Sequence, residues 1–221
     1  MGINHYMSFP ILQFFIYDRD GHVHVAPVAT DLPLGQWCHL AAVSGSGGMR
    51  FYLNGVLASQ DGFSGSFAAI ANGDENYLGK SNWQDNAGFR GQLDEVRVWG
   101  VARTQEQIRA GMHQMLSGSE PGLEALWNFD AGDARDLSPR GRHGQLMGDA
   151  RCLAAPFPGA AEPLKPALLQ GKVSAATGGT LPRALTLLAK DGELAAMSFT
   201  DLQGRYFLGL FTPGSYDLSV K

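Results

Sequence analysis

The stretch Phe89-Arg-Gly-Gln-Leu-Asp-Glu-Val-Arg-Val-Trp99 decides the fold class of this chain. It predicts a strand over 90–99 that ends on a bulky aromatic residue and is followed by a turn at Gly100. Directly after it, Thr104-Gln-Glu-Gln107 has the form of a capping box, and apolar residues follow at helical spacing up to Leu116. A strand and then one surface helix of about three turns are therefore expected here.

Other short segments with β-branched and aromatic residues recur along the chain between turn signals. Asp20-Gly21 and Asn54-Gly55 stand where two-residue hairpin turns are expected, because these dipeptides tolerate left-handed backbone conformations. The 29 Gly and 11 Pro also favour a β protein with many turns. The predicted strands before the helix are 11–17, 22–29, 36–44, 49–59, 77–80 and 90–99, and those after it are 123–129 and 142–147. This spacing is typical of an all-β sandwich.

Charge and cysteine content restrict the function classes. The net charge of −4 and the lack of a Lys/Arg cluster argue against nucleic acid as a partner. The early apolar stretch 11–17 is interrupted by Gln13, so we expect neither a signal peptide in this chain nor membrane insertion. Cys38 and Cys152 are too few for a disulfide framework; two semi-buried thiols are favoured over a disulfide between them.

Several motifs, in order, resemble the laminin-G-like (LamG) jellyroll, a concanavalin A-like β-sandwich. Besides 89–99, they are Trp37-Cys-His-Leu-Ala41, Phe51-Tyr-Leu-Asn-Gly55, Tyr77-Leu-Gly79, Leu126-Trp-Asn-Phe-Asp130 and Asp136-Leu-Ser-Pro-Arg-Gly-Arg-His-Gly144. Family members carry further strands before a segment like 11–17, so the jellyroll is expected to be incomplete at its N-terminus. The resemblance implies a LamG-like domain over residues 1–153.

An Ala/Pro-rich linker is predicted over 154–167, and a second small β-domain over 168–221. The second domain resembles the carboxypeptidase regulatory-like family, a transthyretin-like or Cna-B-type sandwich without catalytic activity. The motifs that carry this resemblance are Gly171-Lys-Val173, Gly179-Thr-Leu-Pro182, Thr200-Asp-Leu-Gln-Gly-Arg-Tyr206 and Pro213-Gly-Ser-Tyr-Asp-Leu-Ser-Val220. Its last strand is expected to be clipped at Lys221.

Catalytic signatures are missing from the sequence. A retaining glycosidase needs two carboxylates about 5 Å apart, but Asp94 and Glu95 are neighbours on the predicted strand and are expected on opposite faces. We expect a buried, hydrogen-bonded Asp94 and an exposed Glu95 near Arg97. His22 and His24 share a strand face and are able in principle to hold a metal. With no third ligand nearby in sequence, an exposed hairpin face is the favoured reading.

The loop 81–88 is the main candidate binding site. Trp83 is placed to stack on a sugar ring, and the oxygens of Asn82, Asp85 and Asn86 are hard ligands suited to Ca²⁺. By resemblance, pentraxin-type jellyrolls bind calcium on the loop in this position. Because the loop offers a single carboxylate, a solvated loop without an ion is favoured over calcium. The acidic loop with Asp130, Asp133 and Asp136 is a second, weaker metal candidate.

These observations lead to one preferred hypothesis and its alternatives. The preferred reading is a non-catalytic pair of modules from a larger surface or secreted protein that binds glycan or extracellular protein through jellyroll loops. The alternatives are an accessory, carbohydrate-binding part of a glycan-degrading enzyme, a glycan-cleaving enzyme itself, and a purely structural spacer.

Overall fold

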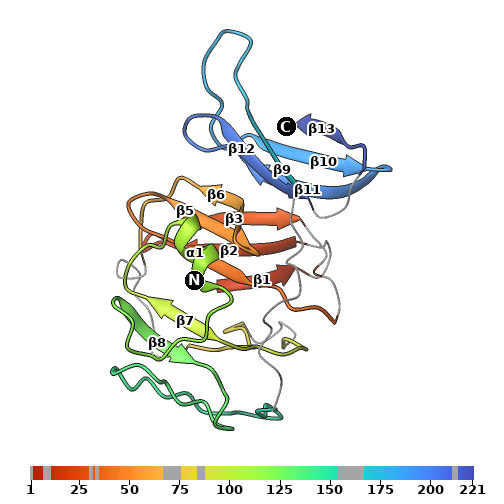
Figure 1. Ribbon diagram of the computed structural model, residues 1–221. Helices are drawn as coiled ribbons and strands as arrows, with labels where there is room; N and C mark the ends of the chain where they lie inside the picture. Colours follow the sequence, from red (N-terminus) through yellow and green to blue (C-terminus); the bar gives the residue numbers. More distant parts are fainter. Residues whose placement is uncertain are drawn as a thin grey trace. The chain divides into compact units, whose positions relative to one another are not determined.

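The computed structural model of the chain describes residues 2–6, 11–29, 32, 35–66, 76–83, 88–153, 167–210 and 214–221 (Figure 1). These residues form strands and loops with one short α-helix, so the all-β prediction is confirmed. The chain divides into two compact units. The first contains Met1–Ile70, Arg103–Met112 and Ala160–Lys221, and the second contains Ala71–Ala102 and His113–Gly159.

The first unit holds two antiparallel three-stranded sheets that share one core. One sheet has the order β1 (Gly2–Tyr6), β2 (Ile11–Tyr17), β3 (Val23–Ala29), and the other β4 (Leu40–Val43), β5 (Met49–Leu53), β6 (Val56–Asp61). Alternate residues of these strands are buried together, as the two-residue repeat of a sandwich requires. The core consists of Leu12, Phe14, Ile16, Ala26, Val28, Met49, Phe51, Leu53 and Ala58. This arrangement is consistent with the predicted concanavalin A-like sandwich.

Strand β1 was not expected from the sequence. It pairs antiparallel with β2 along its whole length, with Gly2 opposite Phe15 and Tyr6 opposite Ile11. The prediction began the sheet at residue 11, and Gly2–Tyr6, with the polar residues Asn4 and His5, does not alternate clearly between apolar and polar residues. The sheet therefore has one more edge strand than the motifs indicated.

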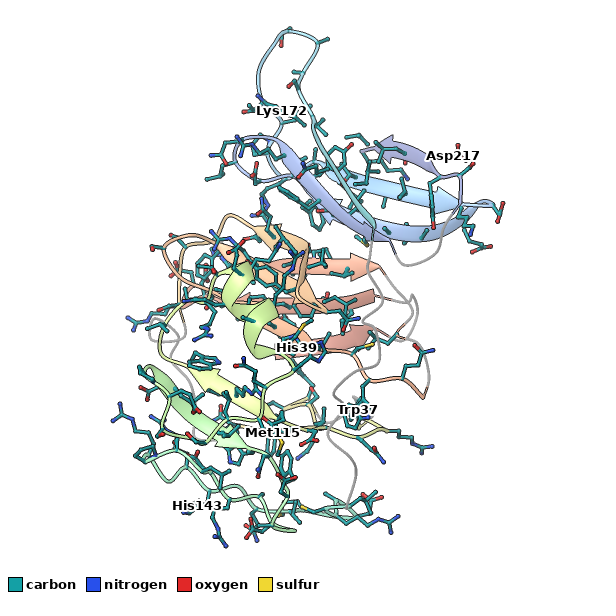
Figure 2. All side chains as sticks on the ribbon, in the orientation of Figure 1. Trp37, His39, Met115, His143, Lys172 and Asp217 are labelled. Atoms are coloured by element: carbon teal, nitrogen blue, oxygen red, sulfur yellow. The ribbon has the colours of Figure 1, made fainter. Side chains whose placement is uncertain are left out.

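Helix α1 (Gln105–Gly111) packs on the outer face of the second sheet. Thr104 caps it with the predicted capping box, in which its hydroxyl accepts from the Gln107 amide and the Gln107 side chain accepts from the Thr104 amide. Ile108 forms a small buried cluster with Val43 and Tyr52. The helix is shorter than predicted because it ends at Gly111, a poor helix residue. Met115, labelled in Figure 2, is therefore exposed beyond the helix end.

The second unit contains the antiparallel pair of β7 (Val96–Trp99) and β8 (Leu123–Trp127). The predicted strand 90–99 was too long at its start. Glu95 has a φ of +50°, a left-handed conformation that interrupts an extended strand, so β7 begins at the next residue. Likewise 77–80 and 142–147 are not strands: Gly79 has a φ of +79°, and the Arg142 amide donates to a side chain instead of a neighbouring strand.

Both predicted hairpin turns occur, and one has a different length. Asn54-Gly55 joins β5 to β6 with φ values of +48° and +73°, as a two-residue turn requires. The β2–β3 hairpin is instead closed by a hydrogen bond from the Asp18 amide to the His22 carbonyl at 2.9 Å. Its turn therefore spans the three residues 19–21, with Gly21 left-handed at φ +83°.

The C-terminal region forms two small antiparallel sheets around its own core. One sheet has the order β11 (Glu193–Phe199), β10 (Leu185–Lys190), β13 (Asp217–Val220), and the other pairs β12 (Arg205–Leu210) with β9 (Ala167–Lys172). Their buried cluster is Leu188, Ala196, Tyr206 and Leu208. The regulatory-like family and the domain limits at 154 and 168 remain predictions from the sequence.

Candidate functional site

Trp83 lies in a part of the second unit that is rich in exposed apolar side chains. Its side chain is 50% exposed, and its backbone amide donates to the Ser81 hydroxyl at 3.1 Å. The amide of Phe89, itself 54% exposed, donates to the Gly79 carbonyl at 2.8 Å, which brings residues 76–83 and 88–93 together. We call these two segments the Trp83 region; its exposed large apolar residues are Tyr77, Leu78, Trp83, Phe89 and Leu93. Such a concentration of apolar surface is typical of a binding site.

A basic residue stands beside the aromatics of this region. The Lys80 ammonium lies 4.4 Å from the centroid of the Tyr77 ring, in the geometry of a cation–π contact. Of the three predicted calcium ligands, Asn82 is exposed in the same segment. Asp85 and Asn86 lie outside the described residues. The calcium prediction therefore remains a prediction.

The second metal candidate is a structural loop around a buried carboxylate. Asp136 accepts hydrogen bonds from the amides of Leu126 at 2.9 Å, Ser138 at 2.8 Å and Arg142 at 2.7 Å, and from the Ser138 hydroxyl at 2.9 Å. Burial raises the pKa of Asp136, but the donated hydrogen bonds outweigh it and hold that pKa below the ordinary value. Its backbone amide donates to His143, labelled in Figure 2, at 3.1 Å.

The other two aspartates of that loop have separate partners. Asp130 accepts from the Asn128 side chain at 2.7 Å, and Asp133 pairs with Arg135 at 2.9 Å. Among the described residues, no group of potential metal ligands brings Asp130, Asp133 and Asp136 together. The hydrogen bonds of Asp136 instead hold this loop against β8.

Asp94 and Glu95 are arranged differently from the prediction. Asp94 is partly buried and accepts from the Glu95 amide at 2.8 Å, and burial raises the pKa of its carboxyl group. The prediction that Glu95 is exposed was wrong: its side chain is 11% exposed and pairs with Arg97 at 2.7 Å. The left-handed backbone of Glu95 removes it from the strand, so the alternation rule for opposite faces does not apply to it.

The exposed face expected for the two histidines is found for His22, whose side chain is 74% exposed, but not for His24, whose side chain is 16% exposed. His24 is opposite Ile16, a fully buried core residue, and is therefore on the core side of the sheet. His22 closes the hairpin opposite Asp18. Asp18 interacts with both imidazoles, and its hydrogen bond with the His24 side chain is the main reason that the pKa of Asp18 is lowered. The sequence argument missed Asp18 because it assumed a two-residue turn, whereas the three-residue turn pairs position 18 with position 22.

Comparison with known proteins supports the sandwich assignment. Residues 7–109 match the Laminin_G_3 model, which describes the Concanavalin A-like lectin/glucanases superfamily. The match supports the LamG-like jellyroll over the part of the chain that includes β2 to β7 and the Trp83 region. Domains of this kind are commonly binding modules.

Sequence similarity to one curated protein accompanies this match. The chain is 37% identical over 81 residues to Pappalysin-1 of Mus musculus, an alignment that covers 35% of the chain and 5% of that protein. The chain therefore spans a small part of this relative. No solved structure gives a significant match.

Two further observations bear on the sequence predictions. Cys38 and Cys152 are free thiols, each partly buried. In the described part of the chain, no helix is long and apolar enough to cross a bilayer.

Proposed function

We propose that this chain is a non-catalytic binding module of an extracellular protein and that it recognises glycans through the Trp83 region. The observation that carries the proposal is the exposed indole of Trp83 among four other exposed apolar side chains, with Lys80 beside Tyr77. Indole rings stack on the apolar face of sugar rings, and a nearby ammonium group donates hydrogen bonds to the hydroxyl groups of the sugar. The lectin-type superfamily matched by residues 7–109 supports the same reading.

The arrangement of carboxylates supports a role without catalysis. Asp94 and Glu95 are the carboxylate pair that the sequence offered for catalysis. Glu95 forms an ion pair with Arg97 at 2.7 Å, and Asp94 accepts a hydrogen bond from a backbone amide. A retaining glycosidase needs one carboxylate free as the nucleophile and a second as the acid. We therefore favour a module that binds glycan over one that cleaves it. A non-cleaving, accessory part of a glycan-degrading protein belongs to the favoured class.

A protein partner is the second candidate, and the aliphatic side chains of the Trp83 region favour it. Leu78 and Leu93 are both exposed and offer nothing specific to a sugar. Exposed Leu beside Trp and Phe is typical of the apolar centre of a protein interface. The C-terminal sandwich is proposed to act as a spacer that carries no ligand.

The proposal is tested with the whole chain on a glycan array, with calcium and with a chelator, followed by titration of the glycans bound. Loss of one stacked aromatic is expected to weaken binding about tenfold, which corresponds to ~1.4 kcal/mol. We therefore expect Trp83→Ala to raise the Kd about tenfold. Trp37→Ala is the matched control, because Trp37 (labelled in Figure 2) is also exposed but lies outside the Trp83 region.

Two results would overturn the glycan proposal. One is a folded chain that binds no glycan on the array with or without calcium. The other is a Trp83→Ala variant that binds with the affinity of the unchanged chain. If neither the unchanged chain nor Trp83→Ala binds a glycan, and Trp83→Ala weakens binding of a purified cell-surface protein, the second candidate replaces the first.

A further inference from the structure

Strand β13 forms one edge of a C-terminal sheet. The strand order β11-β10-β13 leaves the outer side of β13 without a neighbour among the described strands (Figure 1). All four residues of the strand are exposed. The unpaired N–H and C=O groups of a sheet edge can accept a further strand, which is a common mode of association between chains. The edge of β13 is therefore a candidate docking surface.

The ladder between β10 and β13 decides which backbone groups point to the open edge. The amide of Lys221, the residue after β13, donates to the Leu185 carbonyl at 2.8 Å, and its carbonyl accepts from the Leu185 amide at 3.0 Å. In an antiparallel ladder, such doubly bonded pairs alternate with pairs that share no hydrogen bond. Every second residue before Lys221 therefore bonds to β10 as well. The N–H and C=O groups of Leu218 and Val220 point away from β10, to the open edge.

The same two residues carry exposed apolar side chains. Leu218 lies opposite Leu188 in β10, and Val220 lies opposite Thr186, and both of these partners are buried. Because residues directly opposite each other share a face of the sheet, Leu218 and Val220 lie on the face that covers the core. Each of them is nevertheless 45% exposed. The apolar face of the sheet therefore extends beyond the part that is covered.

The strand and the residue after it, Asp217-Leu-Ser-Val-Lys221, are complementary to themselves. When two copies run antiparallel with Leu218 of one opposite Val220 of the other, Asp217 of each copy lies opposite Lys221 of the other. This register joins the backbone groups that point outward. It also pairs apolar with apolar side chains and negative with positive ones, and both kinds of cross-strand pair stabilise a sheet.

We propose that β13 is the contact surface for a second copy of this chain, which adds its own β13 antiparallel about a two-fold axis. The two three-stranded sheets then become one continuous sheet. By symmetry, the dimer has two Leu218–Val220 pairs and two Asp217–Lys221 pairs on each side of the axis taken together. A contact of one short strand is small, so the association is weak and depends on concentration. The competing explanation is a solvated edge, which its short length and terminal charges protect from pairing.

The test is analytical ultracentrifugation of the whole chain from about 10 µM to about 1 mM, a range suited to a small interface. We expect a reversible monomer–dimer equilibrium. Asp217→Lys and Lys221→Asp are each expected to raise the dimer Kd at least about tenfold, because two attractive pairs become repulsive in a symmetric dimer. Mixing the two variants should restore dimerisation, because every Lys of one chain then lies opposite an Asp of the other.

Two further variants separate pairing of β13 from other effects. Asp149→Lys is the matched control, because Asp149 is exposed in the second unit and the variant changes the net charge by the same amount. It should leave the dimer Kd unchanged. Val220→Pro removes an outward N–H group without touching the ladder to β10, so it should weaken the dimer. Circular dichroism checks that each variant is folded.

The outcomes decide between the dimer and the solvated edge. Weakening by each single variant at β13, with recovery on mixing, supports the proposal. It is overturned if the folded chain stays monomeric at the highest concentration, if Asp149→Lys weakens the dimer as much as Asp217→Lys does, or if mixing the two variants restores nothing. Sedimentation needs no glycan, so its result does not depend on the Trp83 region.

Discussion

Replacing Asp136 by alanine is predicted to destabilise the second unit strongly. The carboxylate accepts four hydrogen bonds, three of them from backbone amides. After the replacement, the Arg142 amide reaches water because that residue is exposed, and the Ser138 hydroxyl keeps the Glu124 carbonyl at 3.1 Å. The amides of Leu126 and Ser138 remain buried without an acceptor, because both residues are buried.

The magnitude follows from those two amides. A buried donor left without a partner costs about 1–3 kcal/mol, so the expected loss of unfolding free energy is about 2–6 kcal/mol. A small domain has only about 5–15 kcal/mol in total. Asp136→Asn keeps one acceptor oxygen and is expected to lose about half as much. The loss is therefore large enough to measure in either variant.

Urea unfolding monitored by tryptophan fluorescence measures this loss. Trp127 is a suitable reporter because its indole nitrogen donates to the Arg142 carbonyl of the same loop at 3.1 Å. At a slope of about 2 kcal/mol per molar urea, the midpoint of Asp136→Ala should fall by about 1–3 M. Asp133→Ala is the matched control: its ion pair with Arg135 is exposed, so a change within about 0.5 kcal/mol is expected. An Asp136→Ala variant as stable as that control would refute the reasoning.

Three further predictions concern pH, the helix cap and calcium. Because the folded-state pKa of Asp136 is lowered, its ionised form stabilises the fold fully above the unfolded-state pKa of about 4 and loses this contribution as pH falls through the lower folded value. In an acid titration, Asp136→Asn should therefore lose less stability than the unchanged chain, because only the other carboxyl groups with lowered pKa values, such as Glu120 and Glu124, still contribute. Thr104→Ala removes the capping box of α1 and should lower the unfolding free energy by about 1 kcal/mol in urea, whereas Thr104→Ser should leave it nearly unchanged. If calcium binds at the predicted loop, millimolar Ca²⁺ will raise the melting temperature of the chain and will not do so for Asp85→Asn; equal shifts in both proteins would place calcium elsewhere.

The sandwich strands were predictable because their signals are local. Strand β2 has the predicted limits, and Asn54-Gly55 forms the expected two-residue turn. In each case a short run of residues contains both the period of two and the turn residues that stop it. The capping box of α1 was predictable for the same reason, since both of its partners lie within four residues.

The parts that the sequence did not predict depend on backbone conformations that the residue types at those positions do not indicate. Glu95 adopts a positive φ that glycine normally occupies, so the strand expected from residue 90 begins at Val96. The β2–β3 turn has one residue more than Asp20-Gly21 suggests, and that residue decides which side chains face His22. A one-residue difference in a hairpin turn changes the cross-strand partner, and here it brings Asp18 to the histidines.

Asp136 and Asp18 show why a carboxylate must be judged by its donors before it is assigned a function. A carboxylate has about four lone-pair positions, and at Asp136 four donors from its own loop and β8 occupy them. That carboxylate has no capacity left for a metal, although it stands among other aspartates. At Asp18 the turn amides of Asp20 and His22 occupy one oxygen, while the other faces the imidazoles of His22 and His24. The two carboxylates differ in how the backbone amides are directed: amides donate to both oxygens of Asp136, whereas at Asp18 the turn amides donate to Oδ1.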